Sequence, residues 1–219
     1  MKLSKRLETI LNMCPYGVAA DVGSDHGKLI MSLFLEDKIS HGYAIENKKG
    51  PYDRLVKALE EEKLIDDIIP LFSDGISDIP KSVDILIIAG MGGNTIVDIL
   101  KKDVSKLKYI QTIIIDAHTS IPLVRKEISD LGFVIADEKI VNEDNIYYEI
   151  IKFIRSDVAF YNESDIEFGP ILRSQKPLAF REKYERRLLE IDMLLKSKEL
   201  PESKINALLK EKERIRGIL

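Results

Sequence analysis

The sequence predicts an α/β protein with a doubly wound sheet of seven strands, followed by a C-terminal helical hairpin. Three observations support this fold class. Short apolar segments alternate with helical patterns over residues 18–131. Two more apolar segments, 133–140 and 147–154, follow each other with only a short polar link. The last residues, from 177 onward, are rich in Glu, Lys, Arg and Leu at helical spacing.

The first five predicted strands are apolar along their whole length. Strands of this kind are typical of a parallel sheet that helices cover on both faces. We expect them at residues 18–23, 42–46, 68–72, 83–89 and 112–115, with helices at 28–36, 51–62, 94–101 and 122–131.

The segments after residue 132 close the sheet and extend the chain beyond it. Strands 133–140 and 147–154 should pair antiparallel, because the link between them is too short for a crossover. Residues 157–174, with Gly169-Pro170, have the composition of a connection, and 177–198 and 201–219 should form two antiparallel helices. The predicted division is therefore an α/β domain at 1–157, a linker at 158–172 and a helical hairpin at 173–219.

Composition excludes several classes of protein. The longest apolar stretches are far shorter than the roughly 20 residues of a membrane span, and residues 1–11 mix charges with apolar positions. We therefore expect a cytoplasmic protein without a membrane partner. The single cysteine, Cys14, excludes an internal disulfide and a multi-cysteine metal site, and the three histidines do not indicate a metal.

Charge is distributed unevenly along the chain. The formal net charge is −4, but residues 173–219 hold 13 Lys and Arg against 8 Asp and Glu, a net charge of +5, which leaves −9 on residues 1–172. A basic tail on an acidic body can direct a polyanion to one side of an enzyme. The alternative is that these charges only solvate the helices.

The loop after the first strand carries the sequence Asp21-Val22-Gly23-Ser24-Asp25-His26-Gly27. Ligands of open parallel sheets bind at the carboxyl ends of the strands. The loop lacks the three-glycine dinucleotide fingerprint, and its carboxylates suit a ligand with an ammonium and a sulfonium, such as S-adenosylmethionine, better than a pyrophosphate. The alternative is that Asp21 and Asp25 cap the following helix.

Carboxylates also end the second and third strands. Glu46 can accept hydrogen bonds from both hydroxyls of a ribose, and Asp74, before Gly75, can accept one from an adenine amine. Each is a weak signal alone because acidic residues commonly end strands. Carboxylates at three successive strand ends form a stronger signal for a nucleoside-containing cofactor.

Small residues follow the fourth strand. Gly90-Met91-Gly92-Gly93 leaves room for a flat base and a transferring methyl group, with backbone amides facing the site. The alternative is a tight turn between strand and helix.

Together these segments resemble one family. The resemblance rests on Gly23-Ser24-Asp25-His26, Glu46 with Gly50-Pro51, Ser73-Asp74-Gly75, Ile88 to Gly93, and Glu143-Asp144-Asn145 before Tyr148-Glu149. Leu3-Ser4-Lys5-Arg6-Leu7 and Gly169-Pro170 extend it over the whole chain. The family is that of bacterial tRNA (adenine-22-N1)-methyltransferases.

The resemblance implies a seven-stranded class I, Rossmann-like methyltransferase domain that binds S-adenosylmethionine, and a coiled-coil-like hairpin that helps to hold tRNA. The implied cofactor residues are Asp21, Gly23, Ser24, Glu46, Asp74, Gly75 and Gly90. The implied substrate residues are Met91, Gly92, Gly93, Asp116, His118 and Tyr148. One triplet departs from the family, which commonly has Gln-Pro-Asn where this chain has Asp116-Ala117-His118.

The expected reaction is direct methyl transfer to N1 of adenine, without a metal. The ring nitrogen has an in-plane lone pair, so alignment and desolvation should supply most of the catalysis. Asp25 is the candidate group for the charge that develops toward the exocyclic amine, and His26 is the alternative. A monomer is favoured.

Three other hypotheses remain open from sequence. The chain could methylate another RNA base or a protein, or bind cofactor and RNA with little turnover. A nicotinamide oxidoreductase is disfavoured because the three-glycine pattern is absent.

Overall fold

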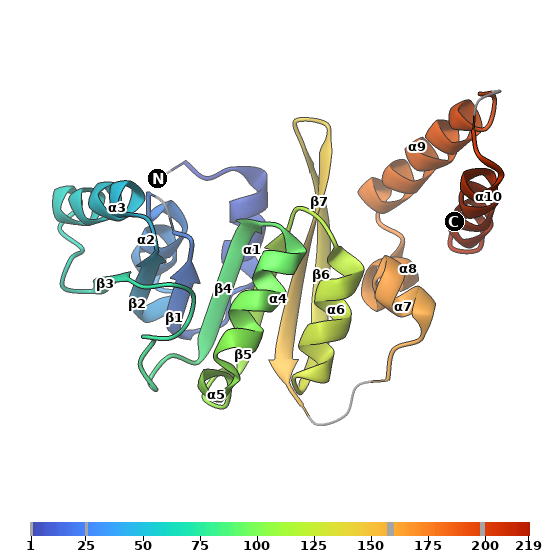
Figure 1. The fold of residues 1–219 in the computed structure, drawn as a ribbon. Coiled ribbons are helices and arrows are strands. Elements are labelled where there is room, and N and C mark those ends of the chain that lie inside the picture. Colours follow the sequence, from blue (N-terminus) through green and yellow to red (C-terminus); the bar gives the residue numbers. More distant parts are fainter. Residues whose placement is uncertain (1, 25, 157–159, 198–199) are drawn as a thin grey trace.

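The seven predicted strands form one mixed sheet in the computed structural model, in the order β3-β2-β1-β4-β5-β7-β6 (Figure 1). The structure describes residues 2–24, 26–156, 160–197 and 200–219. The strands are β1 (Gly17–Val22), β2 (Ile39–Glu46), β3 (Ile68–Phe72), β4 (Ile85–Met91), β5 (Thr112–Ala117), β6 (Phe133–Glu143) and β7 (Ile146–Arg155).

Pairing follows the prediction. Strands β1 to β5 pair in parallel, whereas β7 lies antiparallel between β5 and β6. The strand order reverses beside β1, between the pairs β1–β2 and β1–β4, and that is where open α/β sheets bind ligands. The predicted fold class, a seven-stranded methyltransferase-type sheet with C-terminal helices, is confirmed.

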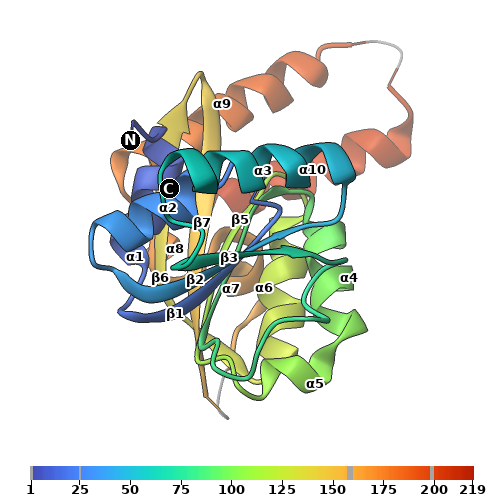
Figure 2. The same ribbon diagram turned by 90° about the vertical axis from the view of Figure 1, so that its left-hand side faces the viewer.

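Helices cover both faces of the sheet (Figure 2). Apolar side chains of α1 (Lys5–Met13), α2 (Lys28–Leu35) and α3 (Lys49–Glu61) pack on one face. Those of α4 (Gly93–Lys102), α5 (Val104–Leu107) and α6 (Ile121–Asp130) pack on the other. The sheet is thereby buried on both faces, which explains why its parallel strands are apolar throughout.

Helix α1 is absent from the sequence-based prediction. The Ser4 Oγ accepts a hydrogen bond from the Leu7 amide at 3.4 Å, which caps the helix start. Ile10, Leu11 and Met13 bury its inner face. The helix carries Arg6 to the carboxyl ends of β1 and β4.

The segment predicted as a plain connection contains two short helices. These are α7 (Glu163–Phe168) and α8 (Pro170–Gln175), and α7 begins with a capping box between Asn162 and Asp165. Turn-forming residues such as Gly169-Pro170 separate two helices here, which is why the composition indicated a loop. The predicted boundary at residue 157 lies outside the described residues.

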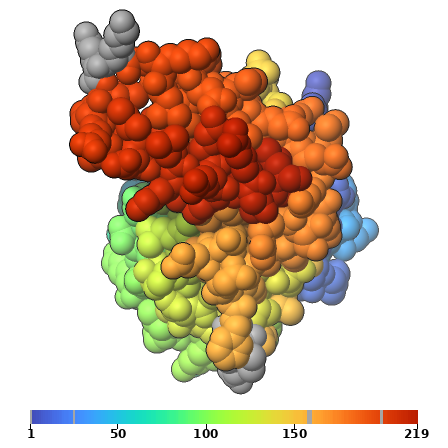
Figure 3. Space-filling model, turned by 90° about the vertical axis from the view of Figure 1, so that its right-hand side faces the viewer, coloured from blue at the N-terminus to red at the C-terminus, as the bar shows by residue number. Residues whose placement is uncertain are grey.

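The C-terminal hairpin consists of α9 (Leu178–Leu194) and α10 (Glu202–Arg216), both shorter than predicted. In Figure 3 these helices cover one side of the molecule. Apolar side chains of the four helices α7, α8, α9 and α10 pack with Ile140 of β6 in one cluster. The hairpin is therefore docked on the sheet. No helix within the described ranges has the length and apolarity needed to cross a membrane.

Candidate active site

Two cavities lie at the carboxyl ends of the central strands. The larger, of 430 Å³, is bordered by the ends of β1, β2, β3 and β4, and the smaller, of 360 Å³, by β1, β4 and helices α1 and α2. Gly23, Ala89 and Gly90 line both cavities. The two therefore meet at the glycine turns after β1 and in β4, and together they can hold an elongated ligand.

Backbone geometry explains glycine at these turns. Gly23 and Gly90 both have φ of +78°, a conformation that side chains rarely permit. A Cβ on Gly23 would also lie 2.3 Å from the Cε of Met91. The predicted residues Gly23, Gly90 and Met91 thus converge, and a ligand can approach the backbone closely where β1 and β4 end.

Asp21 and Ser24 form a hydrogen-bonded pair beside the smaller cavity. The Ser24 hydroxyl donates to Asp21 at 2.6 Å. Burial raises the pKa of Asp21 to about 6, against the Ser24 hydrogen bond, which lowers it, while the nearby Glu46 raises it further. A cationic group of a ligand in this cavity would stabilise the ionised form of Asp21.

Glu46 and Asp74 line the larger cavity with different exposure. Glu46 is buried, whereas the Asp74 side chain is 66% exposed. Asp74 accepts hydrogen bonds from Asn47 at 3.1 Å and Lys102 at 2.7 Å, and these bonds hold its pKa below the usual value. Gly75 follows with φ of +78° in the same cavity. The carboxylates predicted at two strand ends therefore share one cavity.

Three predicted substrate residues, Asp116, His118 and Tyr148, gather near Gly90 together with Arg6, which was not predicted. We call these four residues the base-side cluster. Arg6 Nη1 lies 2.5 Å from Asp116 Oδ2, and the Arg6 guanidinium lies 5.3 Å from the Tyr148 ring centre. The His118 and Tyr148 rings meet edge to face with centres 5.6 Å apart.

Asp116 has unused hydrogen-bonding capacity. Its side chain is fully buried, and its Oδ1 has no hydrogen-bond partner among the described residues. Burial raises the pKa of Asp116, although Arg6, His118 and the nearby Gly90 amide lower it. The Gly90 amide lies near the carboxylate without meeting hydrogen-bond geometry to Oδ1. A buried acceptor without a partner is costly, so a ligand donor such as an exocyclic amine would relieve it.

Gly92 and Gly93 have a packing role in addition to any contact with substrate. Gly92 caps α4, and a Cβ on Gly93 would lie 2.5 Å from the carbonyl oxygen of Thr119. Neither glycine lines the two cavities within the described part of the chain. Gly92 and Gly93 thus let the start of α4 pack closely against the end of β5.

Asp25 and His26 are the two predicted catalytic residues, and Asp25 lies outside the described residues. His26 is exposed at the start of α2 and lines the smaller cavity with Arg6. No group of three or more metal-ligating side chains occurs in the described part of the chain.

Sequence reasoning missed several side chains of the site. Arg6 is the most important, because it lies on an unpredicted helix and contacts two residues far away in sequence. Asn47 and Lys102 are others, since they donate hydrogen bonds to Asp74 from the residue after β2 and from the end of α4. The only available signal for Arg6 was the opening Leu3-Ser4-Lys5-Arg6-Leu7, which the family resemblance included.

The site can hold a nucleoside with a charged tail next to a planar base. Glu46 and Asp74 offer acceptors in one cavity, Asp21 offers a carboxylate in the other, and the glycine turns leave space between them. The base-side cluster adjoins that space through Arg6 and Gly90. S-adenosylmethionine matches this donor and acceptor set, with its ribose, adenine and cationic tail.

Comparison with known proteins supports one family. The family model of tRNA (adenine(22)-N(1))-methyltransferase matches residues 19–216. The Bacillus subtilis tRNA (adenine(22)-N(1))-methyltransferase is 32% identical over 195 residues, which cover 86% of this chain and 82% of the relative.

Solved structures agree. The B. subtilis m1A22 tRNA methyltransferase TrmK has 27% identity, a TM-score of 0.88 and coverage of 99% of this chain and 98% of its own. M. capricolum TrmK in complex with S-adenosyl-homocysteine has 26% identity, a TM-score of 0.88 and coverage of 99% and 97%. A Streptococcus pneumoniae protein in complex with S-adenosyl-L-methionine has 28% identity, a TM-score of 0.91 and full coverage of both chains. The chain belongs to the tRNA (adenine(22)-N(1))-methyltransferase family.

Proposed function

We propose that this chain methylates N1 of an adenine in tRNA, with S-adenosylmethionine as methyl donor. The observation that carries the proposal is the pair of cavities that meet at Gly23 and Gly90, with carboxylates on the cofactor side and the base-side cluster beside them. Membership in the tRNA (adenine(22)-N(1))-methyltransferase family supports the same reaction and substrate.

The cofactor side has acceptors for a nucleoside. Glu46, buried in the larger cavity, would accept hydrogen bonds from the ribose hydroxyls, and Asp74 would accept one from the adenine amine. Asp21, with Ser24, would hold the cationic tail in the smaller cavity. When bound, S-adenosylmethionine supplies an electrophilic methyl group on a sulfonium.

The base-side cluster would hold the target adenine. Asp116 Oδ1 has no partner among the described residues, so it would accept a hydrogen bond from the exocyclic amine while Arg6 fixes the other oxygen. Tyr148 is the candidate for stacking on the base. His26 and Asp25 remain the proposed groups for proton transfer and charge stabilisation. Met91, which lines the larger cavity, is proposed to contact the substrate, and Gly92 and Gly93 would serve it indirectly by letting α4 pack close to the loop after β5.

This arrangement favours N1 because that nitrogen needs no covalent activation. Its lone pair lies in the plane of the ring and attacks the methyl carbon directly, so alignment supplies most of the rate. Positive charge then spreads toward the exocyclic amine, where a carboxylate stabilises it. N1 lies on the pairing edge of adenine, so the base must be unpaired or turned out of its stack.

The helices after the sheet are proposed to contact tRNA, with 1–157 as the methyltransferase domain, 158–172 as the connection and 173–219 as the hairpin. Many basic side chains of the hairpin are paired with acids: Arg187 with Glu211, Lys212 with Asp192 and Arg214 with Glu167. Phosphate binding would therefore have to compete with these pairs, which reduces the benefit of the net charge of +5.

Methyl transfer to total unmodified tRNA, followed by digestion to nucleosides, tests the proposal. We expect 1-methyladenosine that depends on both S-adenosylmethionine and the enzyme. Methylation of another nucleoside would change the substrate assignment. Cofactor binding without any methylated nucleoside would favour an RNA-interaction protein with little turnover.

A further inference from the structure

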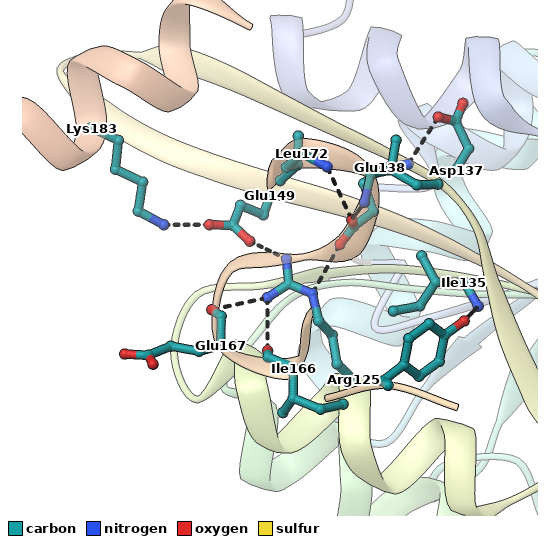
Figure 4. A network of polar contacts seen from close by, with 11 residues as sticks. Arg125, Ile135, Asp137, Glu138, Glu149, Ile166, Glu167, Leu172 and Lys183 are labelled. Atoms are coloured by element: carbon teal, nitrogen blue, oxygen red, sulfur yellow. Dashed lines mark hydrogen bonds and ion pairs between the residues drawn. The ribbon is translucent and has the colours of Figure 1, made fainter. Parts of the chain in front are cut away.

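A buried ionic network joins the C-terminal helices to the sheet (Figure 4). Its members are Arg125 of α6, Glu138 of β6, Glu149 of β7 and Lys183 of α9, which we call the joint network. Arg125 Nε donates to Glu138 at 2.8 Å, and its Nη2 donates to Glu149 at 2.5 Å. Lys183 donates to the second oxygen of Glu149. Two cations and two carboxylates therefore balance inside the protein.

The same network holds the backbone of the two short helices. Arg125 Nη1 donates to the carbonyl oxygens of Ile166 at 3.3 Å and Glu167 at 3.4 Å. The second oxygen of Glu138 accepts from the amides of Ile171 at 2.9 Å and Leu172 at 3.3 Å. Both α7 and α8 are thus bonded to side chains of the catalytic sheet and its helix α6.

Gly169, between those helices, fits the network closely. It has φ of +83°, and a Cβ there would lie 2.5 Å from a Glu138 oxygen and 2.6 Å from Arg125 Nη2. A side chain at this position would push the two ionic partners apart. The Gly169-Pro170 of the sequence therefore has a physical reason, which is the close approach of the backbone to buried charges.

The energetics suggest that this network serves geometry more than stability. Desolvation of buried ion pairs usually costs about as much as their attraction returns, and well-packed apolar residues often replace them without loss. Hydrogen bonds have preferred directions, so they fix one orientation of the helices on the sheet. Apolar contacts are not directional and allow small shifts between the packed surfaces. A 520 Å³ cavity also lies beside the network, lined by Tyr147, Glu149, Lys183 and Arg187 among others. The apolar cluster around Ile140 docks the hairpin on the sheet, and beside this cavity the directed bonds of the network add to that packing.

Strand β7 connects the network to the active site. Successive residues of a strand point to opposite faces. Tyr148 accordingly lies in the base-side cluster, while its neighbour Glu149 lies in the joint network. The tip of the β6–β7 hairpin contacts α9 as well, because Arg186 donates to the Asn145 carbonyl at 3.2 Å and Tyr147 donates to Glu182 at 3.4 Å.

We propose that the joint network is a positioning device, in which Lys183 and Glu149 set the hairpin relative to Tyr148 so that tRNA on the hairpin presents its adenine to the methyl group. The inference rests on the proposed tRNA methylation. Lys183 is a positioning residue, since it acts through Glu149 and β7 and touches no reacting atom.

Lys183 is the member to change, because its loss leaves Arg125 bound to Glu149. The variants are Lys183→Gln, which removes the charge, and Lys183→Arg, which keeps it. Lys212→Gln is the matched control. It removes one lysine from the same hairpin, but Lys212 pairs with Asp192 across α9 and α10 and not with the sheet.

Steady-state methylation of tRNA should separate these variants. We expect Lys183→Gln to lower kcat at saturating tRNA on the order of tenfold, since small misplacements of reacting groups are costly. S-adenosylmethionine affinity should be unchanged, Lys183→Arg should recover most of the rate, and Lys212→Gln should stay within about twofold of wild type. Equal kcat values for Lys183→Gln and Lys212→Gln would overturn the proposal.

Salt dependence distinguishes positioning from direct phosphate contact. A positioning residue leaves the slope of log affinity for tRNA against log salt unchanged, whereas a lost phosphate contact reduces it by about one unit. A reduced slope in Lys183→Gln, with normal kcat at saturation, would make Lys183 a tRNA contact and would overturn its positioning role.

Hydrogen exchange tests the joint without any turnover. The amides of α8 and α9 should exchange faster in Lys183→Gln than in wild type or Lys212→Gln, because the docked state opens more often. Unchanged amide exchange in Lys183→Gln would show that Lys183 does not hold the hairpin against the sheet, and would overturn the proposal. A wild-type enzyme that methylates no tRNA would instead contradict the proposed function, so the two failures are distinguishable.

Discussion

Two buried arginine–carboxylate clusters of this protein differ in how completely they are satisfied. In the base-side cluster, Arg6 bonds one oxygen of Asp116, and the other oxygen has no partner among the described residues. In the joint network, both oxygens of Glu138 and both of Glu149 accept hydrogen bonds. Both clusters contain a contact of 2.5 Å between arginine and carboxylate.

The difference indicates two purposes. Buried polar groups are nearly always paired in folded proteins. The unpaired oxygen of Asp116, whose partner Arg6 lines the smaller cavity, is therefore best understood as reserved for a ligand. A network with all its carboxylate oxygens occupied has nothing to offer a ligand, and it can only hold elements together. Substitutions in the first cluster should therefore affect the reaction, and substitutions in the second should affect the fold and its geometry.

The largest effect is expected for Arg125→Met. This change would remove the positive charge that Glu138 and Glu149 share in a buried site. Breaking a buried ion pair typically costs about 3 to 5 kcal/mol of stability. The free energy of unfolding from urea titration measures it. Lys126→Met is the control on the same helix, because Lys126 forms an exposed pair with Asp130, and such pairs contribute little to stability. Equal losses of unfolding free energy in Arg125→Met and Lys126→Met would show that the buried network stabilises the fold no more than an exposed ion pair does.

The next effect concerns Asp116. Asp116→Ala removes the acceptor proposed for the adenine amine and should lower kcat/KM for tRNA on the order of 100-fold, as loss of one preorganised partner does. Asp116→Asn keeps a carbonyl oxygen and should lose less. S-adenosylmethionine affinity, from calorimetry, should be unchanged in both. If Asp116→Ala retains normal kcat/KM, the unpaired oxygen has no part in catalysis.

Glu46→Ala should have a smaller effect, on cofactor binding. Loss of a carboxylate that accepts from ribose hydroxyls should weaken S-adenosylmethionine by about 1 to 3 kcal/mol. Asp53→Ala, an exposed carboxylate on α3 paired with Lys49, is the control and should leave binding unchanged. Normal affinity in a folded Glu46→Ala protein would exclude Glu46 from the cofactor site.

The smallest effect is a pH dependence that comes from Asp21. Its pKa is raised from 3.8 to about 6, so in the free protein it contributes stability that is present below 3.8 and is lost as pH rises through about 6. A cationic ligand favours the ionised form, so S-adenosylmethionine affinity should fall about tenfold from pH 7 to pH 5. Asp21→Asn should bind more weakly with a flat profile. An equal slope in both proteins would assign the titration to another group.

Much of the fold followed from the sequence because the parallel strands are buried on both faces. Continuous apolar runs identified the five parallel strands. The apolar segments 133–140 and 147–154, with the short link at 141–146 between them, identified the antiparallel pair. Helix α1 could have been predicted, because Ser4 caps its start and Leu7, Ile10 and Leu11 recur at helical spacing. Nothing local indicates that its apolar residues pack against the distant strands β6 and β7. The short helices α7 and α8 depend on Arg125 and Glu138, which local propensity does not reveal.

Site prediction succeeded where strand ends converge and failed where tertiary contacts decide. Gly23, Glu46, Asp74 and Gly90 gather because parallel strands end at one edge of the sheet. Arg6 comes from a helix on one face, and no spacing rule connects it with Asp116 or Tyr148. The partners of Asp74, which are Asn47 and Lys102, belong to the same category.

The base-side cluster is proposed to present adenine 22 of tRNA to the methyl donor, and the base at position 22 can be changed to test this. Single-turnover methyl transfer would be compared between a tRNA transcript with adenine at position 22 and the same transcript with guanine there, followed by nucleoside analysis. We predict stoichiometric 1-methyladenosine in the first and none in the second. Equal 1-methyladenosine in both transcripts, or none in the first, would contradict the claim.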